Sequence, residues 1–330
     1  MTVLLDVHDA VLCDLDGVVY LGREPIPAAV TALRQAREQS MATGFVTNNA
    51  GRSAKDVAEH LRELGVMAAP EQVVTSGDAA AALLGRLLEP GSGVYVAGSP
   101  ALRDAVVREG LGVASADDVL KSPSTSGVVQ GFDPELRWSS LNEATRCVRA
   151  GATWVAANLD ATRPTDLGVL PGTGMMIHAV AVATGKNPHV AGKPHRPVFE
   201  AAVAQASSSR PLFVGDRLDT DIAGARAAGI TSLWVLSGAH GPLDALRVAA
   251  DHLPDHVAAD LAGVLEPEAE VITTTDESGR SRASSGECAV DVDGSTVTAS
   301  GTDVLSLLRC VIALRRAEIE AEYRGVFEGR

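Results

Sequence analysis

Short apolar runs alternate with helical patterns from residue 10 to residue 236, and this alternation is the strongest constraint on the fold. Runs of three to five apolar residues bounded by polar or turn residues are typical of buried parallel strands. Each run is followed by a stretch with apolar residues at helical spacing, as in 28–39 after Pro25 and Pro27. The pattern predicts an α/β fold, with parallel sheets covered by helices.

The expected strands are 10–13, 44–46, 94–97, 127–130, 153–157, 212–214 and 233–236. The expected helices are 28–39, 53–64, 100–109, 139–150, 174–184, 197–206 and 219–228.

The composition and the apolar periodicity of the sequence change after residue 265. Residues 266–287 are acidic, rich in Ser and Thr and without period, so we expect a linker there. Residues 289–298 alternate around Asp293-Gly294, which predicts a β-hairpin. Thr302 is expected to cap a helix that ends near residue 321.

This C-terminal segment therefore reads as a small ββα appendage. A module of this size rarely stabilises itself, so we expect the apolar stripe of its helix to pack on the rest of the chain or on a second subunit. Arg309, Arg315 and Arg316 lie along the same helix and are expected to meet acidic surface.

Composition excludes several classes of protein. The chain carries 28 basic and 42 acidic residues, a net charge of −14, which argues against binding to nucleic acid or to an anionic membrane. Its sequence has no apolar run long enough to span a bilayer, and its start does not resemble a signal peptide. The four cysteines show no CxxC pair, which favours a reducing, cytoplasmic location.

The first motif that suggests chemistry is Asp14-Leu15-Asp16-Gly17, directly after an expected strand. A carboxylate there can attack phosphorus, and a second carboxylate two residues on can transfer a proton. Gly17 permits a close turn of the backbone. Alone, the motif could equally be an acidic turn.

Two further motifs suit a phosphate ester. Thr47-Asn48-Asn49 offers a hydroxyl, amides and backbone N–H groups at a helix start, although an ordinary helix cap has the same composition. Lys193, one of only four lysines, stands between Gly192 and Pro194 and would neutralise phosphoryl oxygens. A solvated surface lysine is the ordinary alternative.

The fourth motif runs from Gly215 to Asp221 and follows the apolar strand 212–214. Its carboxylates suit Mg²⁺, while an acidic helix start is the structural alternative. Each motif has an ordinary explanation alone. All four in this order, at the carboxyl ends of expected strands where α/β proteins bind ligands, favour one catalytic site.

With these motifs the chain resembles the haloacid dehalogenase (HAD) superfamily, and within it the type C2-capped phosphatases related to NagD. The resemblance covers about residues 8–265 and includes Glu24-Pro25-Ile26-Pro27 and Pro171-Gly172-Thr173-Gly174. It implies a doubly wound, Rossmann-like core with an inserted α/β cap. The implied domains are a core at 1–78 and 186–265, a cap at 79–185, and a linker with a small C-terminal module at 266–330.

The resemblance also implies roles for the motif residues. Asp14 would be the nucleophile and Asp16 the general acid and base. Mg²⁺ would be held by Asp14, the backbone carbonyl of Asp16, and Asp216. Asp221 would support these ligands without binding the ion directly. The implied phosphate ligands are Thr47, Asn48, Asn49 and Lys193. In the cap, the implied substrate residues are Asn158, Asp160 and Arg163, where Leu159 replaces the proline that relatives often carry.

The expected activity is Mg²⁺-dependent hydrolysis of a small phosphorylated metabolite through an aspartyl phosphate. Capped relatives act on glycerol phosphate, phosphoglycolate, pyridoxal phosphate or nucleoside monophosphates. The scarcity of aromatic residues in the expected cap disfavours a stacked ring and favours a small polyol phosphate such as glycerol 3-phosphate. A homodimer through the cap or the C-terminal module is a further expectation.

A receiver-like phosphoacceptor protein is the alternative of another class, because it also combines acids, a Thr and a Lys on a parallel sheet. The 146 residues that separate Thr47 from Lys193 argue against it. His252 and His256 could bind a metal ion, but Pro254 between them favours a solvated loop.

Overall fold

The computed structural model describes residues 3–165, 168–267 and 269–328. It forms two compact units, Met1–Thr43 with Ser208–Arg330, and Gly44–Ser207. Among the described residues, no helix is long and apolar enough to cross a membrane.

The first unit contains parallel strands in the order β15-β14-β13-β1. Their bounds are β1 (Ala10–Cys13), β13 (Pro211–Gly215), β14 (Thr231–Val235) and β15 (His256–Ala258). Cys13 pairs with Val214, so the residues that follow β1 and β13 meet at one edge of the sheet. The sequence-predicted strands at 10–13, 212–214 and 233–236 are confirmed within one or two residues.

Short elements complete this sheet layer. The helices are α1 (Leu4–Val7), α2 (Pro27–Glu38) and α10 (Ala223–Ala227), and a hairpin joins β2 (Tyr20–Leu21) to β3 (Glu24–Pro25). A π-helical turn, η3 (Leu218–Ile222), precedes α10. Short 3₁₀ helices are η4 (Asp244–Leu246), η5 (Ala250–His252) and η6 (Leu261–Val264).

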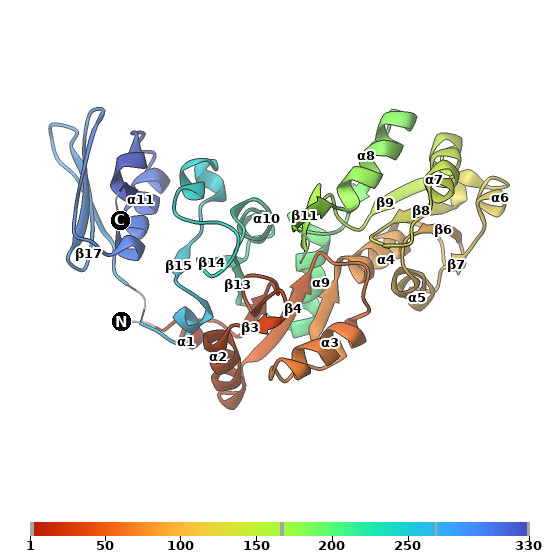
Figure 1. The fold of residues 1–330 in the computed structure, drawn as a ribbon, viewed down its shortest axis with the longest axis horizontal. Coiled ribbons are helices and arrows are strands. Elements are labelled where there is room, and N and C mark those ends of the chain that lie inside the picture. Colours follow the sequence, from red (N-terminus) through yellow and green to blue (C-terminus); the bar gives the residue numbers. More distant parts are fainter. Residues whose placement is uncertain (1–2, 166–167, 268, 329–330) are drawn as a thin grey trace. The chain divides into compact units, whose positions relative to one another are not determined.

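The C-terminal module holds four strands, β16 (Ile272–Thr275), β17 (Ser281–Ser285), β18 (Cys288–Asp293) and β19 (Thr296–Ser300), in one antiparallel sheet. The helix α11 (Val304–Arg316) packs on this sheet, and η7 (Tyr323–Phe327) follows it (Figure 1). The predicted hairpin at 289–298 is confirmed as β18 and β19. The prediction of a linker over 266–287 was wrong, because β16 and β17 lie within it.

The helix cap and the helix end also differ from the sequence prediction. Asp303, not Thr302, caps α11, because its carboxylate accepts a hydrogen bond from Ser306 N at 3.0 Å. The helix ends at Arg316, short of residue 321.

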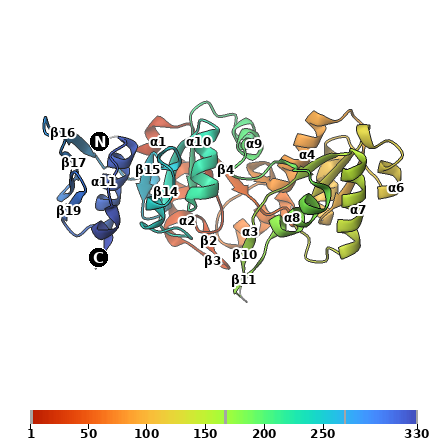
Figure 2. The same cartoon turned by 90° about the horizontal axis from the view of Figure 1, so that it is seen from above.

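Docking of α11 on the body of the first unit is confirmed. Its Leu308 and Ile312 are buried in one apolar cluster with Trp234 and Val257, so the helix lies between its own sheet and the β14–β15 side of the unit (Figure 2).

The arginines of α11 meet mainly backbone carbonyls. Arg309 donates to Val257 O at 2.8 Å and Arg315 to Val248 O at 2.7 Å. Arg316 also contacts an acid, Asp255, at 3.0 Å.

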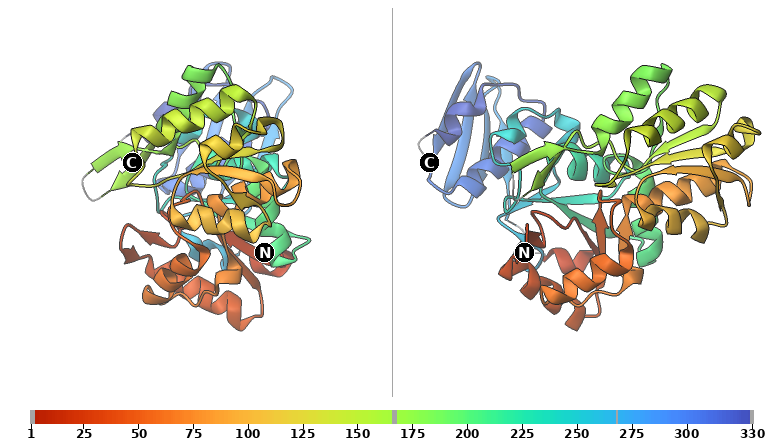
Figure 3. Two further views of the ribbon diagram at one scale, coloured as in Figure 1. Left: turned by 90° about the vertical axis from the view of Figure 1, so that its right-hand side faces the viewer. Right: turned by 45° about the vertical axis from the view of Figure 1, so that its right-hand side comes forward.

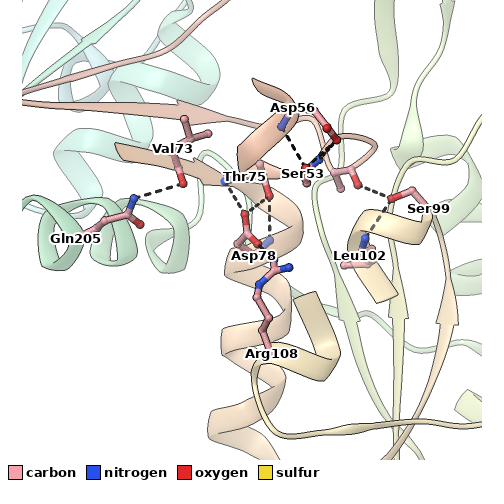
Figure 4. A network of polar contacts seen from close by, with 10 residues as sticks. Ser53, Asp56, Val73, Thr75, Asp78, Ser99, Leu102, Arg108 and Gln205 are labelled. Carbon is pink, nitrogen blue, oxygen red and sulfur yellow. Dashed lines mark hydrogen bonds and ion pairs between the residues drawn. The ribbon is translucent and has the colours of Figure 1, made fainter. Parts of the chain in front are cut away.

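The second unit contains most of β4 (Ala42–Thr47), whose residues Phe45–Thr47 pair in parallel with β5 (Val73–Thr75). Around this pair lie α3 (Ala54–Glu63), η1 (Pro70–Gln72), α4 (Ser76–Leu87) and α9 (Arg196–Ala206). The helices α3 and α4 start at capping boxes, Ser53 with Asp56 and Thr75 with Asp78 (Figure 4). Asp78 also pairs with Arg108.

A separate five-stranded parallel sheet in this unit has the order β12-β9-β8-β6-β7. Its strands are β6 (Gly93–Ala97), β7 (Gly112–Val113), β8 (Gly127–Gln130), β9 (Thr153–Ala156) and β12 (His189–Val190). Its helices are α5 (Pro100–Arg108), α6 (Ala116–Val119), η2 (Pro123–Thr125), α7 (Trp138–Ala150) and α8 (Thr173–Thr184). The helices α7 and α8 lie side by side (Figure 3).

A hairpin of β10 (Thr162–Thr165) and β11 (Gly168–Pro171) connects β9 to α8. Three strands of this sheet, β6, β8 and β9, are those that the sequence placed in a cap, whereas β12 lies beyond the predicted cap boundary at residue 185. The exact boundaries of the core, the cap and the C-terminal module stay a prediction.

Candidate active site

Asp14 and Asp16 follow β1 at the carboxyl edge of the first unit's sheet. The backbone N–H of Asp14 donates to Val214 O at 2.9 Å, which continues the β1–β13 pairing by one residue, and its side chain is largely buried. Asp16 is exposed, and its carboxylate accepts from Gly22 N at 3.3 Å. Asp14 is therefore held firmly at the sheet edge, whereas Asp16 faces solvent.

Three carboxylates gather at this edge. Ligand oxygens of Asp14, Asp216 and Asp221 all lie within 4.8 Å of one another. Asp216 accepts from Ala239 N at 2.6 Å, and Asp221 accepts from Arg217 N at 3.1 Å. The structure thus brings together three acids that the sequence singled out.

These residues fit a magnesium ion. Asp216 and Asp221 are 3% and 0% exposed, and clustered buried carboxylates repel one another unless a cation lies among them. An all-oxygen donor set with one or two carboxylates is what Mg²⁺ prefers. Glycine shapes the site: Gly17 has φ +88°, and a Cβ there or at Gly238 would collide with the Asp216 carboxylate.

A loop that sequence reasoning missed supports the cluster. Residues 237–241 follow β14, where Ala239 binds Asp216 and Ser237 Oγ donates to Gly17 O at 2.7 Å. His240 Nδ1 accepts from Leu218 N at 3.0 Å. The available signal was Gly238 and Gly241, which bracket a polar loop at a strand end.

Two neighbouring groups have shifted pKa values. Burial raises the pKa of Asp219, but the hydrogen bonds and charge of Arg217 outweigh burial, so the pKa of Asp219 is lowered overall. Burial strongly raises the pKa of the Cys13 thiol next to Asp14. Cys13 is thus a packed thiol rather than a nucleophile.

The second unit holds the predicted phosphate ligands. Thr47 ends β4, and its Oγ accepts from Asn49 N at 3.1 Å, which leaves the hydroxyl proton to be donated elsewhere. The Asn49 side chain accepts from Gly51 N at 2.8 Å and shapes the turn.

Lys193 is 4% exposed. Its backbone N–H and its backbone carbonyl both form hydrogen bonds with the side chain of Asn48. Asn48 Oδ1 accepts from Lys193 N at 2.8 Å, and Asn48 Nδ2 donates to Lys193 O at 3.1 Å. Lys193 is therefore a buried residue fixed at its backbone, not a solvated surface lysine.

The predicted substrate residues Asn158 and Asp160 lie against the same asparagine. Asn158 Nδ2 donates to Asn48 O at 2.6 Å, and both carboxylate oxygens of Asp160 are 3.2 Å from Asn48 Nδ2. The structure thus brings Asn48, Asn158, Asp160 and Lys193 together.

Arg163 makes a different contact. Its guanidinium lies 4.9 Å from the centre of the Phe132 ring, a cation–π distance. Sequence reasoning did not single out Phe132, and no local signal marks it.

Models of two families match the chain. Haloacid dehalogenase-like hydrolase matches residues 11–112, and HAD-hydrolase-like matches residues 190–264. The D-glycerol 3-phosphate phosphatase of Mycobacterium tuberculosis is 44% identical over 292 residues, 88% of this chain and 78% of that protein. The acid sugar phosphatase of Staphylococcus aureus is 34% identical over 233 residues, 70% of this chain and 87% of that one.

Solved structures are similar over the whole chain. A glycerol phosphate phosphatase from Mycobacterium tuberculosis in complex with magnesium has a TM-score of 0.85 at 40% identity. The match covers 99% of this chain and 97% of that one.

Proposed function

The chain belongs to the haloacid dehalogenase-like hydrolase family, and from this premise we propose that it hydrolyses small phosphate monoesters with Mg²⁺ through an aspartyl phosphate on Asp14. The observation that carries the proposal is the cluster of Asp14, Asp216 and Asp221 at one sheet edge. When bound there, Mg²⁺ would neutralise negative charge that develops on the transferred phosphoryl group.

In the first step a carboxylate oxygen of Asp14 attacks phosphorus, and the bond from phosphorus to the ester oxygen breaks. Asp16 donates its proton to the departing oxygen. In the second step Asp16 takes a proton from water, whose oxygen attacks phosphorus and frees the Asp14 carboxylate. The exposure of Asp16 supports this role, because its proton must exchange with substrate and water.

We propose that Thr47, Asn49 and Lys193 bind the phosphoryl oxygens, together with the backbone N–H of Asn48. The buried Lys193 and the hydroxyl proton that Thr47 has left to donate support this assignment. Asp16 would add its backbone carbonyl to the magnesium ligands. Asn158, Asp160 and Arg163 would lie around the rest of the substrate.

The substrate we propose is glycerol 3-phosphate. Support comes from the name and the magnesium complex of the mycobacterial relatives, and from the low aromatic content of the chain. The test is a screen of phosphate monoesters that includes glycerol 3-phosphate, phosphoglycolate, pyridoxal phosphate and nucleoside monophosphates. A thousandfold preference for nucleotides in kcat/KM would overturn this choice.

We further propose a cytoplasmic location and a homodimer. All four cysteines are free and buried, which suits a reducing compartment.

On α8, Met175 and Val182 are 45% and 70% exposed, which supports a subunit contact at this helix. Light scattering after size exclusion tests the dimer, and a monomeric mass at micromolar concentration would contradict it.

A further inference from the structure

We propose that Asn48 and Asp160 are positioning residues for Lys193, so that the Asn48 side chain holds this lysine in place instead of binding phosphate itself. The inference deepens the proposed function and rests on it for the role of Lys193. It starts from the hydrogen bonds of one side-chain amide.

The Asn48 amide has all its strong hydrogen-bonding positions engaged. Its oxygen accepts from Lys193 N at 2.8 Å, and its nitrogen donates to Lys193 O at 3.1 Å. The second N–H of that nitrogen points to the Asp160 carboxylate, 3.2 Å from each oxygen. A side-chain amide has two N–H donors, so none is left for a phosphoryl oxygen.

The orientation of this amide follows from its partners. Lys193 N can only donate, whereas Lys193 O and an ionised Asp160 can only accept. In a flipped amide, the nitrogen would lie against another donor, Lys193 N. The oxygen would lie against two acceptors, Lys193 O and the Asp160 carboxylate. Asp160 therefore fixes the orientation in which Asn48 pairs with both backbone groups of Lys193.

The surrounding chain fits closely around this pairing. Gly192 N donates to Ala157 O at 2.7 Å, and a Cβ on Gly192 would lie 2.7 Å from Asn48 Oδ1. The Asn48 carbonyl in turn accepts from Asn158 Nδ2 and Ser76 Oγ, both at 2.6 Å. The backbone of Asn48 is therefore held as firmly as its side chain.

The network joins parts of the chain that are far apart in sequence. Asn48 and Lys193 belong to the predicted core, while Asn158 and Asp160 belong to the predicted cap. Asp160 O accepts from Gly174 N at 2.9 Å, which ties the same loop to the start of α8. A change in the cap loop thus reaches Lys193 through one carboxylate and one amide.

The decisive experiment compares Asn48→Ala in two backgrounds. In the otherwise unchanged protein, we expect kcat/KM for p-nitrophenyl phosphate and glycerol 3-phosphate to fall about 10- to 100-fold, the cost of losing oriented polar contacts. In the Lys193→Ala background, the same substitution should cost less than about threefold, because it acts through the missing lysine. An equal loss in both backgrounds, or no loss in the first, would overturn the proposal.

Asp160→Asn is the second variant, because it preserves size and still accepts a hydrogen bond. We expect a smaller loss than in Asp160→Ala, and a large loss in Asn48→Asp that adding Asp160→Asn partly reverses by restoring a donor between the two side chains. Absence of that reversal would count against the pairing. Asn142→Ala and Asp104→Ala, both exposed and outside the site, are the matched controls, with melting curves for every variant.

A readout without catalysis separates this proposal from the proposed function. Hydrogen exchange of the Lys193 amide should be slow in the unchanged protein and at least about tenfold faster in Asp160→Ala. If the protein hydrolyses no phosphate ester, the proposed function fails but this exchange difference still tests the pairing. Equal exchange rates in a folded Asp160→Ala would overturn the pairing even in an active phosphatase.

Discussion

At the scale of single residues, the proposed mechanism depends most strongly on Asp14. Asp14→Asn should abolish turnover of p-nitrophenyl phosphate, because an amide is too poor a nucleophile to form the phosphoryl intermediate. EDTA should also abolish turnover, and added Mg²⁺ should restore it. Full activity in either test would refute the mechanism. Asp104→Asn serves as the control for a surface carboxylate.

Asp16 allows a finer test, because its proton matters only as much as the leaving group needs it. With glycerol 3-phosphate, an alkoxide departs, and Asp16→Asn should lower kcat/KM about 100- to 10,000-fold. With p-nitrophenyl phosphate, a stable phenolate departs and the loss in the first step should be far smaller. Because Asp16 also serves the second step, which is common to both esters, the comparison uses kcat/KM, which reports only the steps up to departure of the leaving group. Equal losses would mean that Asp16 does not protonate the leaving group.

The sequence identified the catalytic acids because each follows a strand whose apolar run is visible locally. It did not identify the partners of Asn48, which lie 112 and 145 positions away at Asp160 and Lys193. The motif Thr47-Asn48-Asn49 does not show whether the side-chain amide of an asparagine binds a ligand or backbone groups of the protein. The contact of Phe132 with Arg163 was missed for the same reason.

At the scale of elements, the parallel strands and amphipathic helices were predictable from their apolar periods. The strands β16 and β17 were not, because their sequences, ITTT and SRASS, hold few apolar residues. In β17 small residues take the buried places: Ser281, Ala283 and Ser285 face inward. Burial of serine and alanine against α11 needs no apolar alternation, so the usual strand signal was absent.

Asp255 joins the α11 helix to the parallel sheet, and its removal should weaken that joint. Its carboxylate binds Arg226 at 2.6 Å, Arg316 at 3.0 Å and Ser232 Oγ at 2.9 Å. Asp255→Ala should lower the free energy of unfolding by about 1–3 kcal/mol, measured by urea denaturation. Asp251→Ala, on a side chain that is 80% exposed, is the control.

The same carboxylate predicts a pH dependence. Burial raises the pKa of Asp255, but its bonds to Ser232 and the charges of Arg226 and Arg316 outweigh burial and lower it overall. A lowered pKa contributes stability above the unfolded value, near 3.9, and loses it as the pH falls toward the folded pKa. The stability gap between the unchanged protein and Asp255→Ala should therefore be constant from pH 7 to about pH 5 and shrink below about pH 4. A gap that widens in acid would contradict this.

At the scale of the whole molecule, the C-terminal module is a structural part of the first unit. Its Leu308 and Ile312 share an apolar cluster with Trp234 and Leu253, and its arginines bind carbonyls between residues 245 and 257. The module therefore covers Trp234 of β14. The carboxyl end of β14 leads into the loop that binds Asp216.

Truncation after Leu265 separates a docking role from a regulatory one. The truncated protein should melt several degrees lower, because Trp234 and its neighbours lose their apolar cover. Its kcat for glycerol 3-phosphate should be retained below the new melting temperature, because none of the proposed catalytic groups lies beyond residue 265. Ile312→Ala gives the same test with the module present, and should lower stability by about 2–5 kcal/mol without changing kcat. If the truncated protein stays folded with the same assembly state but loses catalysis, the module regulates the enzyme and the docking account is wrong.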